Sequence, residues 1–95
     1  MIVKGKTQSG IKFELDSKIK DDARLIFLLT KAQNADDSMV ASKAVMDLLT
    51  LIFGSDDNVF VFMNEVARVH DGICHTKYLI AELQEMFDKL NAKNS

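Results

Sequence analysis

The residues with the greatest capacity for chemistry lie together between His70 and His75, in the segment HDGICH. Imidazole, carboxylate and thiolate groups all bind zinc, and a thiolate beside an imidazole can act as a nucleophile. A structural zinc site usually needs two pairs of closely spaced ligands, and the chain has one cysteine, Cys74. A catalytic base must reach the sulfur in the fold, which neighbouring positions alone do not ensure. We therefore interpret this segment as a polar loop and predict no metal, no cofactor and no catalytic residue.

Three pairs of adjacent aspartates could also be considered for acid–base chemistry, at positions 21–22, 36–37 and 56–57. Each pair lies at or near the start of an expected helix, where a capping side chain and the helix dipole favour negative charge. Signatures for phosphate loops, dinucleotide binding, serine hydrolases and zinc proteases are absent from the sequence. We interpret the aspartates as helix caps, and we expect that the protein is not an enzyme.

Size and charge narrow the possible partners. The chain has 95 residues, which suits one domain, and its net charge is −2. Nucleic-acid-binding domains usually carry a basic excess, so no nucleic acid is expected. No apolar run is long enough to cross a membrane, and Lys4 and Lys6 interrupt the N-terminus before any signal-peptide core. The single cysteine fits a reducing compartment, so we expect a cytoplasmic protein.

The elements that must position these residues begin with a predicted β-hairpin. Apolar and charged residues alternate from Ile11 to Leu15, which is the period of a half-buried strand. Residues 2–6 form a second candidate strand, and the intervening TQSG segment is typical of a turn. Because an isolated hairpin is marginally stable, its apolar face is expected to rest on helices.

Four helices are expected after the hairpin, over about residues 17–34, 38–53, 56–70 and 75–91, from apolar residues spaced by three and four. The first is expected to be capped by Asp16 or Ser17, and the third by Ser55, while Gly54 ends the second. The buried side of the first helix is expected to contain Ile19, Ala23, Ile26 (or Phe27) and Thr30. In the last helix, Glu82 is expected on the side opposite the apolar stripe Leu79, Leu83, Met86, Phe87 and Leu90.

The predicted fold class is therefore mainly α, with an N-terminal β-hairpin followed by about four helices in a small bundle. We expect a single domain over residues 1–95, in which residues 1–15 form the hairpin, residues 16–91 form the helical bundle and residues 92–95 form a frayed tail.

Three apolar runs contain more hydrophobic surface than such a bundle can enclose. They lie at residues 25–29, at residues 48–53, where Thr50 interrupts the run, and at residues 60–63. Successive helical residues turn by about 100°, so four or five apolar residues in a row surround the helix. The excess could be covered by the hairpin, or by another copy of the chain or a different protein. The candidate contact residues in these runs are Phe27, Phe53, Phe60, Phe62 and Met63.

The order of these features resembles a known family, over nearly the whole chain. The chain opens with MIVKGKT, turns at Ser9-Gly10, has an apolar helix that ends LIFG at Gly54, a polar loop at Asp71-Gly72 and a last helix that contains ELQEMF. This order is similar to that of the tail assembly chaperones of long-tailed (siphovirus-type) phages and prophages of Gram-positive bacteria. The segments Val69-His70 and Cys74-His75 depart from the pattern, because that loop is usually more charged.

The resemblance implies a non-enzymatic protein that binds the tape measure protein, keeps it soluble and helps to bring tail tube subunits around it. It also implies a homo-oligomer that acts in the bacterial cytoplasm and is not part of the mature virion. Members are often extended by ribosomal frameshifting, and Ala92-Lys93-Asn94 could be encoded by a slippery run of adenines. The alternative that the sequence leaves open is a small helical dimeric regulatory or adaptor protein.

Overall fold

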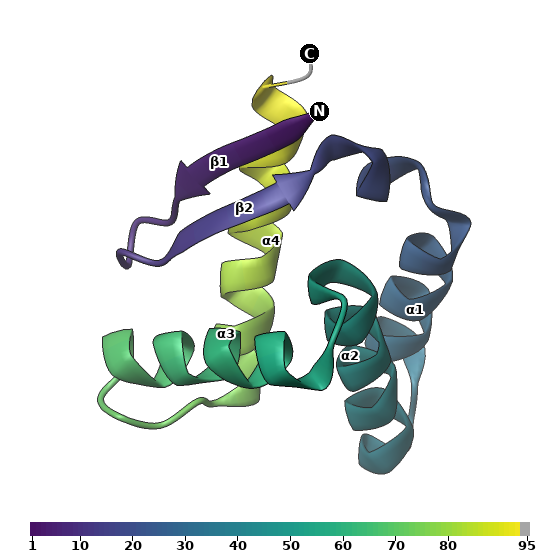
Figure 1. Ribbon diagram of the computed structural model, residues 1–95. Coiled ribbons are helices and arrows are strands. Elements are labelled where there is room, and N and C mark those ends of the chain that lie inside the picture. Colours follow the sequence, from purple (N-terminus) through teal and green to yellow (C-terminus); the bar gives the residue numbers. More distant parts are fainter. Residues whose placement is uncertain (94–95) are drawn as a thin grey trace. The chain divides into compact units, whose positions relative to one another are not determined.

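The computed structural model describes residues 1–93 of the chain. Within them, an antiparallel hairpin precedes four α-helices, as the sequence predicted for a mainly α protein (Figure 1). The elements in order are β1 (Ile2–Lys6), β2 (Lys12–Asp16), the 3-10 helix η1 (Ser17–Asp21), α1 (Ala23–Asn34), α2 (Ser38–Phe53), α3 (Asp56–Val69) and α4 (Thr76–Lys93).

The contacts divide the chain into two compact units. Unit 1 combines residues 1–17 with the chain from Phe60 onwards, so it contains the hairpin, most of α3 and α4. Unit 2 is the intervening segment Lys18–Val59, with η1, α1 and α2. A single domain over residues 1–95 remains a prediction. The tail predicted to fray from residue 92 is helical to Lys93, and residues 94–95 lie outside the described residues.

The hairpin of unit 1 has an apolar face and a charged face. Val3, Phe13 and Leu15 are buried, whereas the charged residues of the strands, Lys4, Lys6, Lys12, Glu14 and Asp16, are exposed. The Phe13 ring lies against Gly5, where an added Cβ would be 2.6 Å from its Cζ atom. Because no larger residue fits there without displacing the ring, Gly5 allows the aromatic side chain to cover the neighbouring strand.

Helix α4 supports this hairpin, as expected for an isolated pair of strands. It contacts β1, and Glu85 Oε2 accepts a hydrogen bond of 2.6 Å from the backbone N–H of Gln8 in the turn. The apolar stripe predicted for α4 is buried at Leu79, Leu83, Met86 and Leu90, with Phe87 half-buried. From α3, Phe62 and Val66 are buried.

Unit 2 is built from α1 and α2, which contact each other extensively. The predicted bounds of α2 are confirmed: the Asp37 side chain accepts a hydrogen bond from Met39 N–H, and Gly54 ends the helix with a left-handed φ of 90°. The predicted start of the first helix is wrong. The segment after β2 forms η1, and α1 begins only after Asp22, whose side chain accepts from Arg24 N–H at 2.9 Å.

The face predicted to be buried in the first helix is also wrong. Leu25 is buried and Leu28 and Leu29 are half-buried, whereas Ile26 and Phe27 are 63% and 64% exposed. An apolar run around the helix gives no preferred face by itself, so packing against α2 selects which residues are enclosed.

Candidate protein-interaction surfaces

The apolar run in α1 leaves two adjacent large side chains at the surface of unit 2, Ile26 and Phe27. The Lys31 ammonium lies 5.8 Å from the centre of the Phe27 ring, one helical turn further on. This is a cation–π distance, and the lysine leaves most of the ring open. On the side of α1 that faces α2, a hollow of about 400 Å³ is lined by Arg24, Leu28, Asp47, Thr50 and Leu51.

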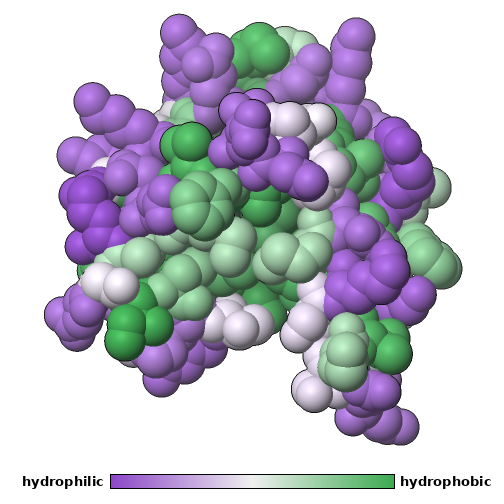
Figure 2. Space-filling model, turned by 60° about the horizontal axis from the view of Figure 1, so that its bottom comes forward, coloured by the Kyte–Doolittle hydropathy of each residue, from purple (hydrophilic) through white to green (hydrophobic). Residues whose placement is uncertain are grey.

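The run in α3 divides in the same way. Val59 and Phe62 are 6% exposed, whereas Phe60 and Val61 between them are 65% and 61% exposed. Polar residues, among them Asn64, continue this side of the helix. Figure 2 shows hydrophobic side chains that reach the surface among hydrophilic ones. Because Phe60 and Val61 are largely accessible, the hairpin does not cover the whole apolar excess.

The five candidate contact residues therefore have three different environments. Phe27 and Phe60 are exposed, Phe53 and Met63 are half-buried, and Phe62 is buried. Phe27 and Phe53 belong to unit 2 and the other three to unit 1, so each unit has its own apolar surface. Ile26 and Val61 were missed as individual candidates, although the same runs contain them.

The polar segment after α3 holds a compact cluster that the sequence did not predict. The chain turns at Asp71 and Gly72, which have left-handed φ angles of 61° and 84°. This turn leaves His70 stacked on Tyr78 of α4, with ring centres 4.2 Å apart and planes 2° from parallel. His70 Nε2 lies 3.1 Å from Glu82 Oε1.

Glu82 is buried, contrary to its predicted place on the solvent side of α4. It is three residues from Leu79 and four from Met86, so it lies on the same side of the helix as these two. Its Oε1 atom meets His70, and its Oε2 atom has no hydrogen-bond partner among the described residues. The sequence signal was this spacing, which places Glu82 at the border of the apolar stripe.

Cys74 does not enter this cluster as an activated nucleophile. It is half-buried, and burial raises the pKa of its thiol, which disfavours the thiolate. His75 meets the edge of the Tyr78 ring at 5.7 Å between centres. No group of three or more His, Cys, Asp or Glu side chains that could hold a metal ion occurs in residues 1–93.

Comparisons with protein families, curated proteins and solved structures found no match to this chain. No single helix in the described part is long and apolar enough to cross a membrane. The bent pair formed by α2 and α3 would be long and apolar enough, judged by length and composition only. The surfaces themselves therefore carry the functional argument.

Proposed function

We propose that this chain is a non-enzymatic tail assembly chaperone of long-tailed phages and prophages of Gram-positive bacteria. In this proposal it binds the tape measure protein in the host cytoplasm, assists the assembly of tail tube subunits around it and is absent from the mature virion. The resemblance in the order of sequence features supports the family, and the exposed apolar residues of α1 and α3 support the mode of binding.

The observation that carries the proposal is the exposure of neighbouring large apolar side chains within two helices. Ile26 with Phe27, and Phe60 with Val61, are each more than 60% exposed. Isolated exposed apolar residues are ordinary, but adjacent pairs that include an aromatic ring are typical of contact surfaces. A long helical client has an apolar stripe that such surfaces can cover.

The two surfaces also suit binding in many copies. A small apolar pair gives a weak contact, which several copies along one client convert into strong overall binding. Association between copies would place more of these pairs on the same client. A homo-oligomer is therefore part of the proposal, together with the tape measure protein and possible contact with the tail tube protein.

Co-expression with the tape measure protein encoded beside this chain tests the proposal. We expect the soluble fraction of the tape measure protein to increase, and we expect Phe27→Ser and Phe60→Ser to reduce that increase. Ile73→Ser is the matched control, since Ile73 is apolar and 57% exposed but lies outside the helices. Thermal unfolding of each variant measures whether the variant keeps the fold.

An unchanged solubility of the tape measure protein would contradict the proposal. If the chain then formed a stable dimer in light scattering, the regulatory or adaptor alternative would replace it. An equal effect of Ile73→Ser would show that general hydrophobicity, rather than the two helical surfaces, maintains the client in solution.

A further inference from the structure

The hairpin of unit 1 has backbone groups that face away from its own ladder. Ser17 N–H donates to Met1 C=O at 2.8 Å, and Thr7 N–H donates to Ile11 C=O at 2.9 Å. In an antiparallel ladder, hydrogen-bonded and non-hydrogen-bonded residue pairs alternate. Since the pairs at these two ends are hydrogen-bonded, Ile2, Lys4 and Lys6 belong to non-bonded pairs, and their backbone N–H and C=O groups point away from β2. The sheet has two strands in residues 1–93, so no further strand lies beside β1.

The side chains of this charged face are not electrostatically balanced. Lys6 lies directly opposite Lys12, whereas Lys4 lies opposite Glu14. Directly opposed like charges destabilise a ladder, and side chains are closest in a non-bonded pair such as this one. Neither Lys6 nor Lys12 makes an ion pair with a described residue.

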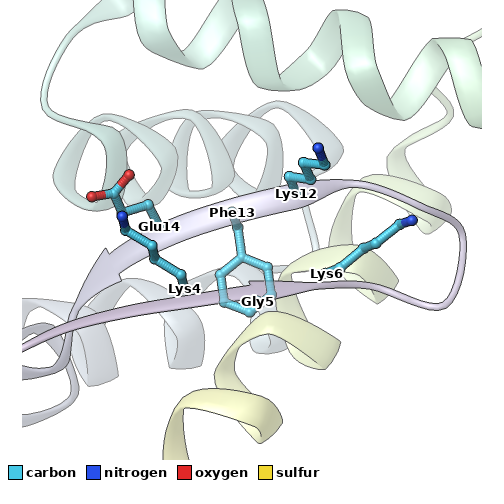
Figure 3. A pocket seen from close by; sticks show the side chains of 6 residues that line it. All are labelled: Lys4, Gly5, Lys6, Lys12, Phe13 and Glu14. Atoms are coloured by element: carbon cyan, nitrogen blue, oxygen red, sulfur yellow. The ribbon is translucent and has the colours of Figure 1, made fainter.

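A hollow of about 520 Å³ coincides with this part of the hairpin. Its lining consists of Lys4, Gly5, Lys6, Lys12, Phe13 and Glu14. Figure 3 shows Lys4 and Glu14 toward one end and Lys6 and Lys12 toward the other. Three ammonium groups and one carboxylate thus surround a surface that is bordered by an open strand edge.

We propose that this hairpin binds an acidic, extended protein segment, which adds as a third strand beside β1. The segment's backbone pairs with the outward N–H and C=O groups of β1. Its alternate carboxylates lie beside Lys4 and Lys6 and relieve the repulsion between Lys6 and Lys12. This surface is separate from the apolar pairs of α1 and α3, so the inference goes beyond the proposed function and does not depend on it.

Charge favours this occupant over a second copy of the chain. Symmetric pairing of β1 with β1 of another copy would bring the lysines of both copies together. Small anions could neutralise the lysines, but they would leave the strand edge without a partner. An acidic strand can satisfy both the lysines and the strand edge. Its backbone pairs with β1, and its carboxylates on one face have the same spacing as the lysines of β1.

The test measures binding of a fluorescent ten-residue peptide of alternating glutamate and valine by anisotropy at low salt. We expect saturable binding that Lys6→Glu combined with Lys12→Glu weakens by at least about tenfold. Lys31→Glu combined with Lys77→Glu is the matched control, since it changes the net charge equally at exposed positions elsewhere. Equal weakening by both pairs would overturn the proposal.

A second peptide separates strand addition from simple charge attraction. Methylating the backbone nitrogens of all its central residues keeps the charge but removes the donors that a third strand would offer to β1. We expect this peptide to bind at least about tenfold more weakly, because a third strand depends on these hydrogen bonds. Equal binding of the methylated peptide, or equal competition by inorganic phosphate, would overturn strand addition.

The thermal midpoint of Lys6→Glu distinguishes a binding role from a structural one. A glutamate opposite Lys12 replaces a repulsive pair with an attractive one, so the variant should unfold at a higher temperature while it binds the acidic peptide more weakly. A lower midpoint together with weaker binding would contradict the inference, since disruption of the hairpin would then explain both. Concentration-dependent self-association that the acidic peptide reverses would assign the edge to a second copy.

Discussion

Phe60 and Phe62 show how much the environment can change within one turn of α3. They are chemically identical and two positions apart, yet one is 65% exposed and the other 6%. Helical geometry separates their directions by about 200°. The sequence could establish that both could not be enclosed by the same neighbour, but the choice between them depended on which side of α3 packs against the rest of unit 1.

These two phenylalanines provide a matched pair for a stability measurement. Phe62→Ala should lower the free energy of unfolding by about 3–5 kcal/mol, because it removes a buried ring and leaves a cavity. Phe60→Ala should change it by no more than about 0.5 kcal/mol, since its ring is mostly in water. Urea denaturation measures both values, and similar losses for the two variants would contradict the assigned burial.

His70 and Glu82 form the second contrast at this scale. Their side chains are 19% and 3% exposed, so the buried carboxylate depends on one neighbour, His70, for the hydrogen bond at Oε1. Removing that neighbour would leave a buried polar group unsatisfied, whereas removing both partners would not.

His70→Ala should therefore lower the free energy of unfolding by about 1–3 kcal/mol. Adding Glu82→Leu should recover part of this loss, since an apolar residue of similar size needs no partner. Full recovery is not expected, because His70 also stacks on Tyr78. Chemical denaturation of the two single variants and the double variant gives the comparison; a double variant less stable than His70→Ala would contradict it.

Helix caps explain which elements could be predicted from the sequence. The end of α2 followed from Gly54 and its start from the break at residues 34–38, which offers several capping residues, because caps and a left-handed glycine are local signals; the structure uses Asp37. The start of α1 was wrong because Asp16 and Ser17 offered equally suitable caps. Asp22, directly after the 3-10 helix, is the cap instead, and its carboxylate accepts two further hydrogen bonds from the Arg24 side chain.

The cap at Asp22 should make the stability of α1 depend on pH. Hydrogen bonds from the Arg24 side chain, followed by the one from its backbone, lower the pKa of Asp22 from 3.8 to about 2. A carboxyl with a lowered pKa in the folded state stabilises above its unfolded pKa, and this contribution disappears as the pH falls through about 2.

Asp22→Asn keeps a capping oxygen but removes the charge. Its thermal midpoint should therefore lie below that of the unmodified chain at about pH 5, and the gap should become smaller at about pH 2. Asp21→Asn is the control, because Asp21 is an exposed neighbour with no cap role in α1. A gap that is constant with pH would contradict the role of the ionised carboxylate.

The candidate surfaces were predictable only in part at this scale. The sequence left open whether the hairpin or another chain covers the apolar excess of the runs at residues 25–29 and 60–63, and in the structure both runs contain exposed pairs. Their composition did not reveal which members are accessible, since every direction around the helix is apolar. Likewise, the pairing of His70 with Glu82 spans a turn whose left-handed residues, Asp71 and Gly72, fix the geometry after α3.

At the scale of the whole molecule, the two units predict regional stability. Leu48 in α2 is 2% exposed and belongs to unit 2. Leu48→Ala should cost about 2–5 kcal/mol in that unit. In native-state hydrogen exchange, amides of α1 and α2 should then exchange faster, while the buried part of α4 should change less. A uniform increase would instead show one cooperative domain, as the sequence predicted.

The discontinuous path of unit 1 has a consequence during translation. Its hairpin leaves the ribosome first, but the α4 residues that complete the unit follow only after all of residues 18–59 have been made. At ~5–20 residues per second, roughly 4–15 s separate the synthesis of Leu15 from that of Leu90. During that interval the apolar side of the nascent hairpin lacks its native cover, whereas η1, α1 and α2 are completed before the interval ends and can begin to assemble.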